Sequence, residues 1–483
     1  MRTARLMIAA PKSGSGKTMV TCALLQALKE EGRRVVSFKC GPDYIDPMFH
    51  ETVLGVPCRN LDTFFTGEKE TQALFLRERK EGELAVLEGV MGLFDGLGGV
   101  RKEGSSYHLA QVTKTPILLT VDARGMGRSL IPLIAGFLSY DREHLIRGIL
   151  LNRMGRSSYE TLKPLLEREL SVPVLGCLPE KKELRMESRH LGLILPGELS
   201  DLKKQMKEAA AALRETVCLE EILALAQSAG ELSEPSACVH PALSDRRPVI
   251  AVARDEAFCF YYEDNLRLLR EYGAKLRFFS PLHDSALPAD ACGLLLGGGY
   301  PELYARVLSE NRSMLASVRE AFGRRMPVVA ECGGFLYLHE TLTDEAGNAW
   351  PMAGVIPASC SKRDRLVRFG YVELSEKRSR FLPEGTRIRG HEFHYYDSSD
   401  NGADCLAAKP VTGRSWPCVH EGDSFWLGFP HLYYPSNPAF AGRFVKMAER
   451  FCGSQKKRKT AGPFLDKTEG LCDTKTDSGC EHT

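Results

Sequence analysis

The stretch RLMIAAPKSGSGKTMVTCALLQAL, residues 5–28, decides the fold of the first half of the chain. An apolar run at residues 6–10 leads into a glycine-containing loop, and after the loop apolar residues recur at the spacing of a helix. This order predicts a strand, a phosphate-binding loop and a helix, because glycines at a helix N-terminus leave backbone N–H groups free to surround phosphate oxygens. We therefore expect an α/β domain organised around this unit.

The loop itself suggests how a nucleotide is held. Lys17 would reach the terminal phosphates, and the Thr18 hydroxyl would bind Mg²⁺. The usual first glycine of a phosphate loop is replaced by Pro11. The rest of the loop resembles the deviant loop of dethiobiotin synthetase and MinD-like ATPases, which often carry a lysine where Lys12 stands. The predicted ATP-binding residues of the loop are Lys12, Gly14, Gly16, Lys17 and Thr18.

Composition limits the class of protein. A chain of 483 residues is expected to form two or three domains. Its 64 Lys and Arg against 62 Asp and Glu give no overall field that would attract nucleic acid or an anionic membrane. The 15 cysteines contain no C-x-x-C pair, which argues against a disulfide framework and a zinc ribbon. No apolar run approaches eighteen residues and no signal region is visible, so we expect a cytoplasmic protein without a membrane partner.

Acidic residues follow two of the next predicted strands. Residues 33–39, RRVVSFK, predict a buried strand that continues into the loop CGPDYIDP, and a third strand ends near Glu88. The loops after the carboxyl ends of parallel strands face the ligand crevice. We therefore expect Asp43 and Asp46 near substrate or metal, and Glu88 at a phosphate-bound Mg²⁺, which prefers oxygen ligands. The alternatives are that the aspartates only build turns and that Glu88 is a solvated strand-end acid.

The alternation of strands and helices continues through the first half. Further strands at residues 116–121 and 146–151 predict a parallel sheet that is covered on both faces. Asn152 follows the last of these strands, where its amide could read the adenine edge; a plain turn residue is the alternative. Residues 199–227 favour one or two helices that close the domain. Residues 228–245 lose periodicity and predict an inter-domain linker.

A second α/β pattern begins at residues 248–253, PVIAVA. A later strand, ACGLLL, ends in three glycines, which allow backbone N–H groups to face a developing negative oxygen. The segment PVVAECGGFLYL places Cys332 between a strand and an apolar helix, which is the arrangement of a nucleophile elbow with sulfur in place of a hydroxyl. The predicted oxyanion and glutamine-binding residues are Gly297, Gly298, Gly299 and Gly333.

A thiol nucleophile needs a base. A lone cysteine beside a strand is usually an inert core residue, but the glycines around Cys332 favour a nucleophile. The candidate base is His431 in GFPHLYY, about a hundred residues downstream. His391 and His394 in GHEFH compete for that role, and we interpret them as pocket-lining or structural histidines.

These motifs together resemble the cobyrinic acid a,c-diamide synthase family over about residues 1–450. The resemblance is carried by APKSGSGKT, KCGPDYIDP, EGVMGLFDG, LGGGYPE, AECGGFLYL, FGYVEL, GHEFHYYD and GFPHLYYPSNP. It implies an N-terminal P-loop domain with a parallel sheet, like dethiobiotin synthetase, joined to a C-terminal class I glutamine amidotransferase α/β domain. Many triad amidotransferases carry a glutamate two residues after the histidine. Tyr433 stands there in this chain, a replacement shared by relatives, and it leaves the third triad member unassigned.

The resemblance also implies an activity. Cys332 and His431 would release ammonia from glutamine, and the first domain would use ATP and Mg²⁺ to activate a carboxylate of cobyrinate as an acyl phosphate, which ammonia converts to an amide. The a and c acetates of cobyrinate would be amidated on the way to cobalamin. The residues expected to orient the acceptor carboxylate are Asp43, Tyr44 and Asp46, and those expected at the metal are Thr18, Asp43 and Glu88.

The predicted division of the chain has four parts. They are a P-loop domain at 1–198, a helical segment and linker at 199–247, an amidotransferase domain at 248–450 and a disordered polar tail at 451–483. Within the same chemistry, hydrogenobyrinate or nickel sirohydrochlorin is the alternative acceptor. From another class, the chain could be a MinD-like nucleotide switch with a binding-only second half; a lysine such as Lys12 can act across a dimer interface, so a homodimer is possible.

Overall fold

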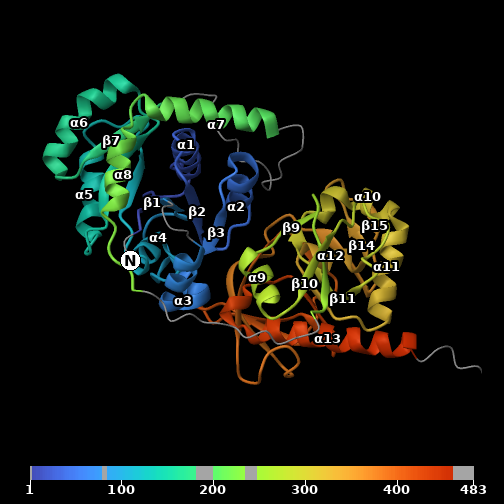
Figure 1. The fold of residues 1–483 in the computed structure, drawn as a ribbon. Coiled ribbons are helices and arrows are strands. Elements are labelled where there is room, and N and C mark those ends of the chain that lie inside the picture. The colour runs from blue at the N-terminus through green and yellow to red at the C-terminus, as the bar shows by residue number, and fades with distance from the viewer. Residues whose placement is uncertain (1–2, 79–83, 181–198, 234–246, 461–483) are drawn as a thin grey trace, which may run out of the picture.

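The chain folds into two α/β halves that lie side by side, blue to green and yellow to red in Figure 1. The computed structural model describes residues 3–78, 84–180, 199–233 and 247–460. The predicted fold class is confirmed, because each half is built on a largely parallel sheet with helices packed against it.

The first half contains a seven-stranded sheet in the order β3-β2-β4-β1-β5-β6-β7, and all its pairings are parallel. The strands are β1 (Arg5–Ala9), β2 (Val35–Cys40), β3 (Cys58–Leu61), β4 (Leu84–Glu88), β5 (Ile117–Asp122), β6 (Ile146–Asn152) and β7 (Val174–Leu178). Most positions of these strands are buried, as expected of a parallel sheet with both faces covered.

Helices cover both faces of this sheet. The helices are α1 (Lys17–Glu30), α2 (Ile45–Phe49), α3 (Thr63–Glu78), α4 (Ser106–Val112), α5 (Leu130–Tyr140), α6 (Arg156–Leu170), α7 (Leu199–Arg214) and α8 (Leu219–Gln227). One cluster of buried apolar side chains packs α1, α7 and α8 against one face of the sheet. A second cluster packs α3, α4, α5 and α6 against the opposite face. The predicted closing helices are therefore confirmed as α7 and α8.

The second half contains a six-stranded sheet in the order β10-β8-β11-β13-β23-β22, which is parallel except for β22. Its strands are β8 (Val249–Ala253), β10 (Lys275–Phe279), β11 (Ala291–Leu296), β13 (Val328–Glu331), β22 (His420–Glu421) and β23 (Phe425–Gly428). The helices of this half are α9 (Glu263–Glu271), α10 (Ala305–Glu310), α11 (Arg312–Gly323), α12 (Gly333–Tyr337) and α13 (Ala439–Thr460).

Three smaller sheets complete the second half. One pairs β9 (Phe258–Phe260) with β12 (Gly298–Gly299). Another is formed by β14 (His339–Thr343), β15 (Ala349–Pro351), β16 (Ile356–Lys362) and β19 (Tyr396–Ser398). The last contains β17 (Arg368–Glu376), β18 (Ile388–His394), β20 (Cys405–Ala408), β21 (Ser415–Cys418) and β24 (His431–Leu432). The pairing of β18 with β24 brings two of the predicted histidines, His391 and His431, opposite one another.

Two predicted boundaries are wrong. The polar tail was expected to begin at residue 451, but α13 continues to Thr460, because Phe451 is buried in the core of the second half and Cys452 packs against it. The linker was expected to begin at residue 228, but Leu232 is buried in the core of the first half. Residues 234–246 and 461–483, which hold the rest of the predicted linker and tail, lie outside the described residues. Within those described, no helix combines the length and apolar character needed to cross a membrane.

Arg5 ties the first strand to distant parts of the first half. Its side chain is fully buried, and its guanidinium donates hydrogen bonds to the carbonyls of Thr3, Thr113, Lys114 and Gly230. Replacing Arg5 by methionine is expected to lower the free energy of unfolding by about 3 kcal/mol, because buried carbonyls lose a charged donor. The check is a lower urea midpoint by circular dichroism than for Arg312→Met, an exposed control. Equal midpoints for the two variants would contradict this role of Arg5.

Candidate active site

The phosphate loop connects β1 to α1 as the sequence predicts. Gly16 lies in the left-handed region with φ 89°, and a Cβ there would stand 2.1 Å from Nδ2 of Asn152. Only glycine fits this position without a clash. The loop therefore brings its backbone close to the end of β6 and leaves the N-terminus of α1 free to face an anion.

Asn152 is placed underneath this loop. Its amide is buried, and its Nδ2 donates to the carbonyl of Ser15 at 2.8 Å. The contact fixes the shape of the loop. The neighbouring Arg153 pairs with Asp122 at 2.6 Å and also donates to the carbonyl of Gly14 at 3.2 Å, which adds a second tie. A contact of Asn152 with adenine stays a prediction.

The two lysines of the loop differ in exposure. Lys12 is exposed at the loop tip, whereas Lys17 is buried and donates to the carbonyls of Lys12 and Met91. Burial, followed by the charge of nearby Lys39, lowers the pKa of Lys17 to about 8. An arriving phosphate would supply the negative charge that favours the ammonium form.

A group of charged side chains lies beside the loop, at the ends of β2 and β4. Glu88 accepts hydrogen bonds from Oγ1 of Thr18 at 2.7 Å and from Nζ of Lys39 at 2.9 Å. Lys39 also pairs with Asp46, and Nε2 of His50 lies 3.3 Å from Glu88. Burial acts to raise the pKa of Glu88, but Lys39 and His50 hold it well below its usual range. Glu88 is therefore an anion in contact with Thr18, at the end of the phosphate loop.

This group fits Mg²⁺ in its chemistry. Thr18 and Glu88 offer a hydroxyl and a carboxylate within one hydrogen bond of each other, and Mg²⁺ takes hard oxygen ligands while keeping several waters. Among the described residues, no cluster of three or more His, Cys, Asp or Glu could hold a metal by itself. The residues thus suit an ion that is bound largely by phosphate and water.

Asp43 has a structural task in addition to its predicted ones. Its Oδ1 accepts from the backbone N–H groups of Ile45 at 2.8 Å and Asp46 at 3.1 Å, so it closes a turn that leads into the short helix α2. Its Oδ2 lies 3.9 Å from Nζ of Lys39. The turn-building alternative is therefore observed, and a role of Asp43 at metal or acceptor stays a prediction.

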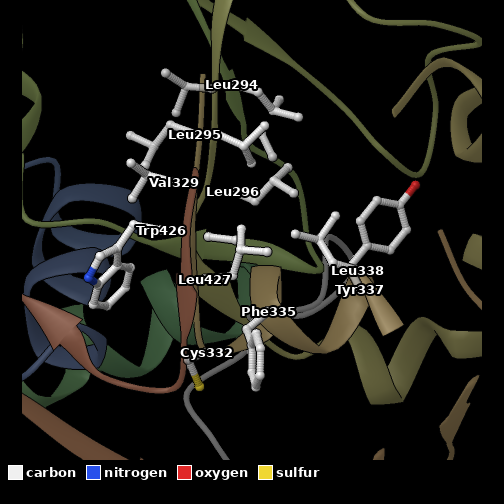
Figure 2. Packing of buried hydrophobic residues seen from close by; sticks show 14 of the residues in the cluster. Leu294, Leu295, Leu296, Val329, Cys332, Phe335, Tyr337, Leu338, Trp426 and Leu427 are labelled. Atoms are coloured by element: carbon white, nitrogen blue, oxygen red, sulfur yellow. The ribbon is translucent and has the colours of Figure 1, made fainter. Parts of the chain in front are cut away.

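Cys332 sits at a strained turn between β13 and α12. Its φ of 45° and ψ of −101° are unusual for a residue with a side chain, and its backbone N–H donates to the carbonyl of Gly428 at 2.9 Å. Figure 2 shows the sulfur below the leucine and valine side chains that pack against the sheet. Burial, followed by the charge of Glu302, raises the pKa of the Cys332 thiol, so the resting group is the neutral thiol. The geometry is that of the predicted nucleophile elbow.

His431 reaches the same place from β24. A Cβ on Gly298 would stand 2.3 Å from Cε1 of His431, and a Cβ on Gly333 would stand 2.9 Å from the backbone nitrogen of Gly299. The structure therefore brings together the elbow, the glycine loop and the predicted base. Burial, together with His391, lowers the pKa of His431 well below its ordinary value, so the imidazole of the resting site is neutral.

Tyr433 does not replace the missing carboxylate of a triad. Its hydroxyl donates to Oδ2 of Asp264 at 2.7 Å, a buried contact with α9. Its neighbour Tyr434 donates to Glu331 at 3.2 Å. Nδ1 of His431 has no hydrogen-bond partner among the described residues.

Tyr44 connects the two halves at this point. Its ring stacks on Phe260 with centroids 5.0 Å apart, and it lies 5.3 Å from the ring of His431. The loop that carries Tyr44 also carries Asp46, which pairs with Lys39 beside the phosphate loop. Tyr44 was expected near the acceptor carboxylate, and the structure places its ring against the base of the second half. Contact with an acceptor stays a prediction.

A small pocket of about 30 Å³ with unpartnered polar groups lies beyond Phe429, the residue after Gly428. It is lined by Arg368, Glu392, His394 and Phe429 among others, and Gly428 accepts a hydrogen bond from the N–H of Cys332. Oε2 of Glu392 and Nε2 of His394 are buried and have no hydrogen-bond partner among the described residues. His394 stacks on Phe429 with centroids 4.0 Å apart. Burial raises the pKa of Glu392 to about 7.

Sequence reasoning missed three contributors to these sites. Lys39 and His50 both contact Glu88, and Asp62 accepts a hydrogen bond from Tyr371 of the second half. Lys39 had a detectable signal, since a lysine at the end of an apolar strand needs a buried partner. Neither His50 nor Asp62 stands in a pattern that would have indicated its contact.

Two family models match the chain. Residues 6–194 match the CobQ/CobB/MinD/ParA nucleotide binding domain, and residues 249–422 match the CobB/CobQ-like glutamine amidotransferase domain. The first range contains the phosphate loop and Glu88, and the second contains Cys332.

Curated relatives extend over nearly the whole chain. Cobyrinate a,c-diamide synthase of Caldanaerobacter subterraneus subsp. tengcongensis is 37% identical over 449 residues, which cover 92% of this chain and 98% of that protein. The protein of the same name from Dehalococcoides mccartyi strain ATCC BAA-2266 is 35% identical and covers 93% of this chain and 99% of its own length. The protein of the same name from Salmonella typhimurium strain LT2 is 37% identical, and the match covers 92% of this chain and 98% of that protein.

Proposed function

The chain belongs to the cobyrinate a,c-diamide synthase family, and from this membership we propose that it converts the a and c acetates of cobyrinate to amides, using ATP and the ammonia of glutamine. The observation that carries the proposal is that one chain contains a cysteine elbow opposed by a neutral histidine and a phosphate loop beside a buried carboxylate. The first can release ammonia, and the second can activate a carboxylate.

Glutamine hydrolysis would proceed in the second half. The thiol of Cys332 gives its proton to His431 as the sulfur attacks the carboxamide, and the glycine loop faces the oxyanion. His431 then protonates the leaving ammonia, and water releases glutamate from the thioester. In the resting site the thiol and the imidazole are both neutral, which are the protonation states from which this transfer starts.

Amide formation would proceed in the first half. A carboxylate is a poor electrophile, so it is first phosphorylated by ATP, and ammonia then displaces phosphate from the acyl phosphate. Lys17 neutralises charge on the terminal phosphates, while Thr18 and Glu88 would hold Mg²⁺, which neutralises charge on the same phosphates when bound. The loop with Asp43 and Asp46 is our proposed site for the acceptor carboxylate.

The two reactions are assigned to different halves of the chain. We place amide formation in the first half, which α7 and α8 close, and glutamine hydrolysis in the second half, which extends through α13. We also place the reaction in the cytoplasm. A homodimer would give the exposed Lys12 a partner phosphate site. Light scattering of the purified protein measures its mass in solution and so distinguishes a monomer from a homodimer.

The test is mass spectrometry of cobyrinate incubated with the protein, Mg·ATP and glutamine. Two amidations that then stop, with Cys332→Ser active only on ammonium ions, are the expected result. If cobyrinate is unchanged and hydrogenobyrinate or nickel sirohydrochlorin is amidated, that macrocycle is the acceptor and the proposed chemistry still holds. Glutamine hydrolysis that persists in Cys332→Ala would contradict the mechanism.

The pocket beyond Phe429 leads to a prediction about glutamine binding. Glu392 and Arg368 carry charges opposite to those of the α-ammonium and α-carboxylate of glutamine, and the pocket would have to widen from its volume of about 30 Å³ to admit these groups. Glu392→Gln is therefore expected to raise the KM for glutamine about tenfold or more, because a charged hydrogen bond is lost. Amidation with ammonium ions should be unchanged.

The same residue sets a pH dependence. Since the pKa of Glu392 is about 7, its binding-competent carboxylate is present above that pH, so kcat/KM for glutamine should rise between pH 6 and 8. This limb should disappear in Glu392→Gln. Steady-state glutaminase assays measure both effects, and a variant with normal KM would exclude Glu392 from glutamine binding.

A further inference from the structure

His431 lacks the partner that usually orients a catalytic histidine. In triads a carboxylate bonds to the second ring nitrogen and holds the imidazole in place. Here Nδ1 of His431 has no hydrogen-bond partner among the described residues, and Tyr433 is engaged with Asp264. The ring of His431 is nevertheless almost completely buried, so packing must fix its orientation.

Three aromatic rings surround this imidazole. His391 is stacked at 5.5 Å, Phe260 lies at 6.4 Å, and Tyr44 lies at 5.3 Å with its plane tilted by 50°. His391 and Phe260 belong to the second half, as His431 does. Tyr44 alone of the three comes from the first half, so this wall of the histidine pocket exists only where the two halves meet.

Tyr44 is itself held firmly. Its ring is buried, stacks on Phe260 with an angle of 8° between the planes, and packs on Tyr262 at 4.5 Å. The hydroxyl of Tyr262 also donates to the carbonyl of Pro42 at 3.4 Å, within the same loop. A movement of this loop would therefore be transmitted to the ring beside His431.

The other end of the loop reaches the phosphate site. Asp46, two residues after Tyr44, pairs with Lys39, and Lys39 pairs with Glu88, which accepts from Thr18. Phosphates, a cation or an acceptor carboxylate arriving there would compete for these ion pairs. The loop at residues 41–46 thus contacts the charged groups of one site and the base of the other.

We propose that Tyr44 is a positioning residue for His431, and that it makes glutamine hydrolysis depend on the state of the 41–46 loop. The ring supplies by packing the orientation that a triad carboxylate supplies by hydrogen bonding. Ligands of the first half shift the loop between arrangements, and the loop shifts the imidazole relative to Cys332. The inference rests on the proposed function for the identity of those ligands. Under it, the rate of glutamine hydrolysis depends on whether the ligands of the first half are bound.

The test compares Tyr44→Ala with Tyr44→Phe in the full-length protein. Glutamate release is measured with glutamine alone and with glutamine, Mg·ATP and cobyrinate. In the unmodified protein, Mg·ATP and cobyrinate should stimulate glutaminase kcat. Tyr44→Ala should lower the glutaminase kcat about tenfold or more, with glutamine alone as well as with all ligands, because misplacement of a base by a fraction of an ångström is costly. The KM for glutamine should change little. Stimulation by Mg·ATP and cobyrinate should be abolished. Tyr44→Phe, which keeps the ring, should restore kcat to within about twofold.

Further outcomes decide the inference. If Tyr44→Ala fails to fold, Tyr44→Leu, which fills the space without an aromatic ring, should show the same loss of kcat. Normal kcat and stimulation in Tyr44→Ala or Tyr44→Leu would overturn the inference. A rise in the KM for glutamine with an unchanged kcat would overturn it as well. Because glutamate release is measured directly, a protein that hydrolyses glutamine but leaves cobyrinate unchanged would refute the proposed acceptor and leave the effect of Tyr44 on basal kcat measurable.

Discussion

Replacing Gly298 by alanine is expected to abolish glutamine-dependent amidation while amidation with ammonium ions continues. A Cβ at this position would stand 2.3 Å from Cε1 of His431 and 3.2 Å from Cβ of Phe260. Neither neighbour can retreat easily, because both rings are packed against Tyr44. The imidazole must move away from Cys332, and we expect the glutaminase kcat to fall by about 10²-fold or more.

A matched control separates this clash from a general effect of the added methyl group. Gly323 ends α11 in the same half and does not have a positive φ, and no atom lies within 4 Å of the place that a Cβ would take there. Gly323→Ala should therefore keep normal activity with both nitrogen sources. The measurement is product formation by mass spectrometry with glutamine and, separately, with ammonium ions. Normal use of glutamine by Gly298→Ala would show that the loop is not part of the hydrolytic site.

Local patterns in the sequence were sufficient for most of the fold. The strand, loop and helix around Lys17 and the turn at Cys332 are short segments whose composition dictates their shape, so both were predicted where they occur. The parallel order also placed Glu88 and Asp46 at the same edge of the sheet, and the structure joins them through Lys39.

Contacts between the halves could not be predicted in this way. Tyr44 and His431 are separated by nearly four hundred residues, and nothing in either motif indicates that the two rings touch. The hydrogen bond from Tyr371 to Asp62 is of the same kind. Helix ends were missed for another reason, because the burial of Phe451 depends on the tertiary core rather than on the polar residues that follow it.

Exchanging Glu88 for glutamine is expected to reduce amidation by about 10²-fold or more with either nitrogen source, since charge stabilisation at the phosphates is lost. Glu88 accepts from Thr18 at 2.7 Å and from Lys39 at 2.9 Å, and Lys39 and His50 hold its pKa well below the usual range, so it is the anion of this cluster. A neutral amide leaves Lys39 with less negative charge around it and removes a proposed ligand of Mg²⁺.

The dependence of the rate on Mg²⁺ concentration distinguishes the two consequences. If Glu88 acts through the metal, Glu88→Gln should require a higher Mg²⁺ concentration for half-maximal ATP-dependent amidation, measured with ammonium ions so that the second half is bypassed. Glu103→Gln is the matched control, because Glu103 pairs with Arg101 at the surface. A lower rate with an unchanged Mg²⁺ requirement would assign Glu88 to the support of Lys39 and His50, and an unchanged rate would remove it from the site altogether.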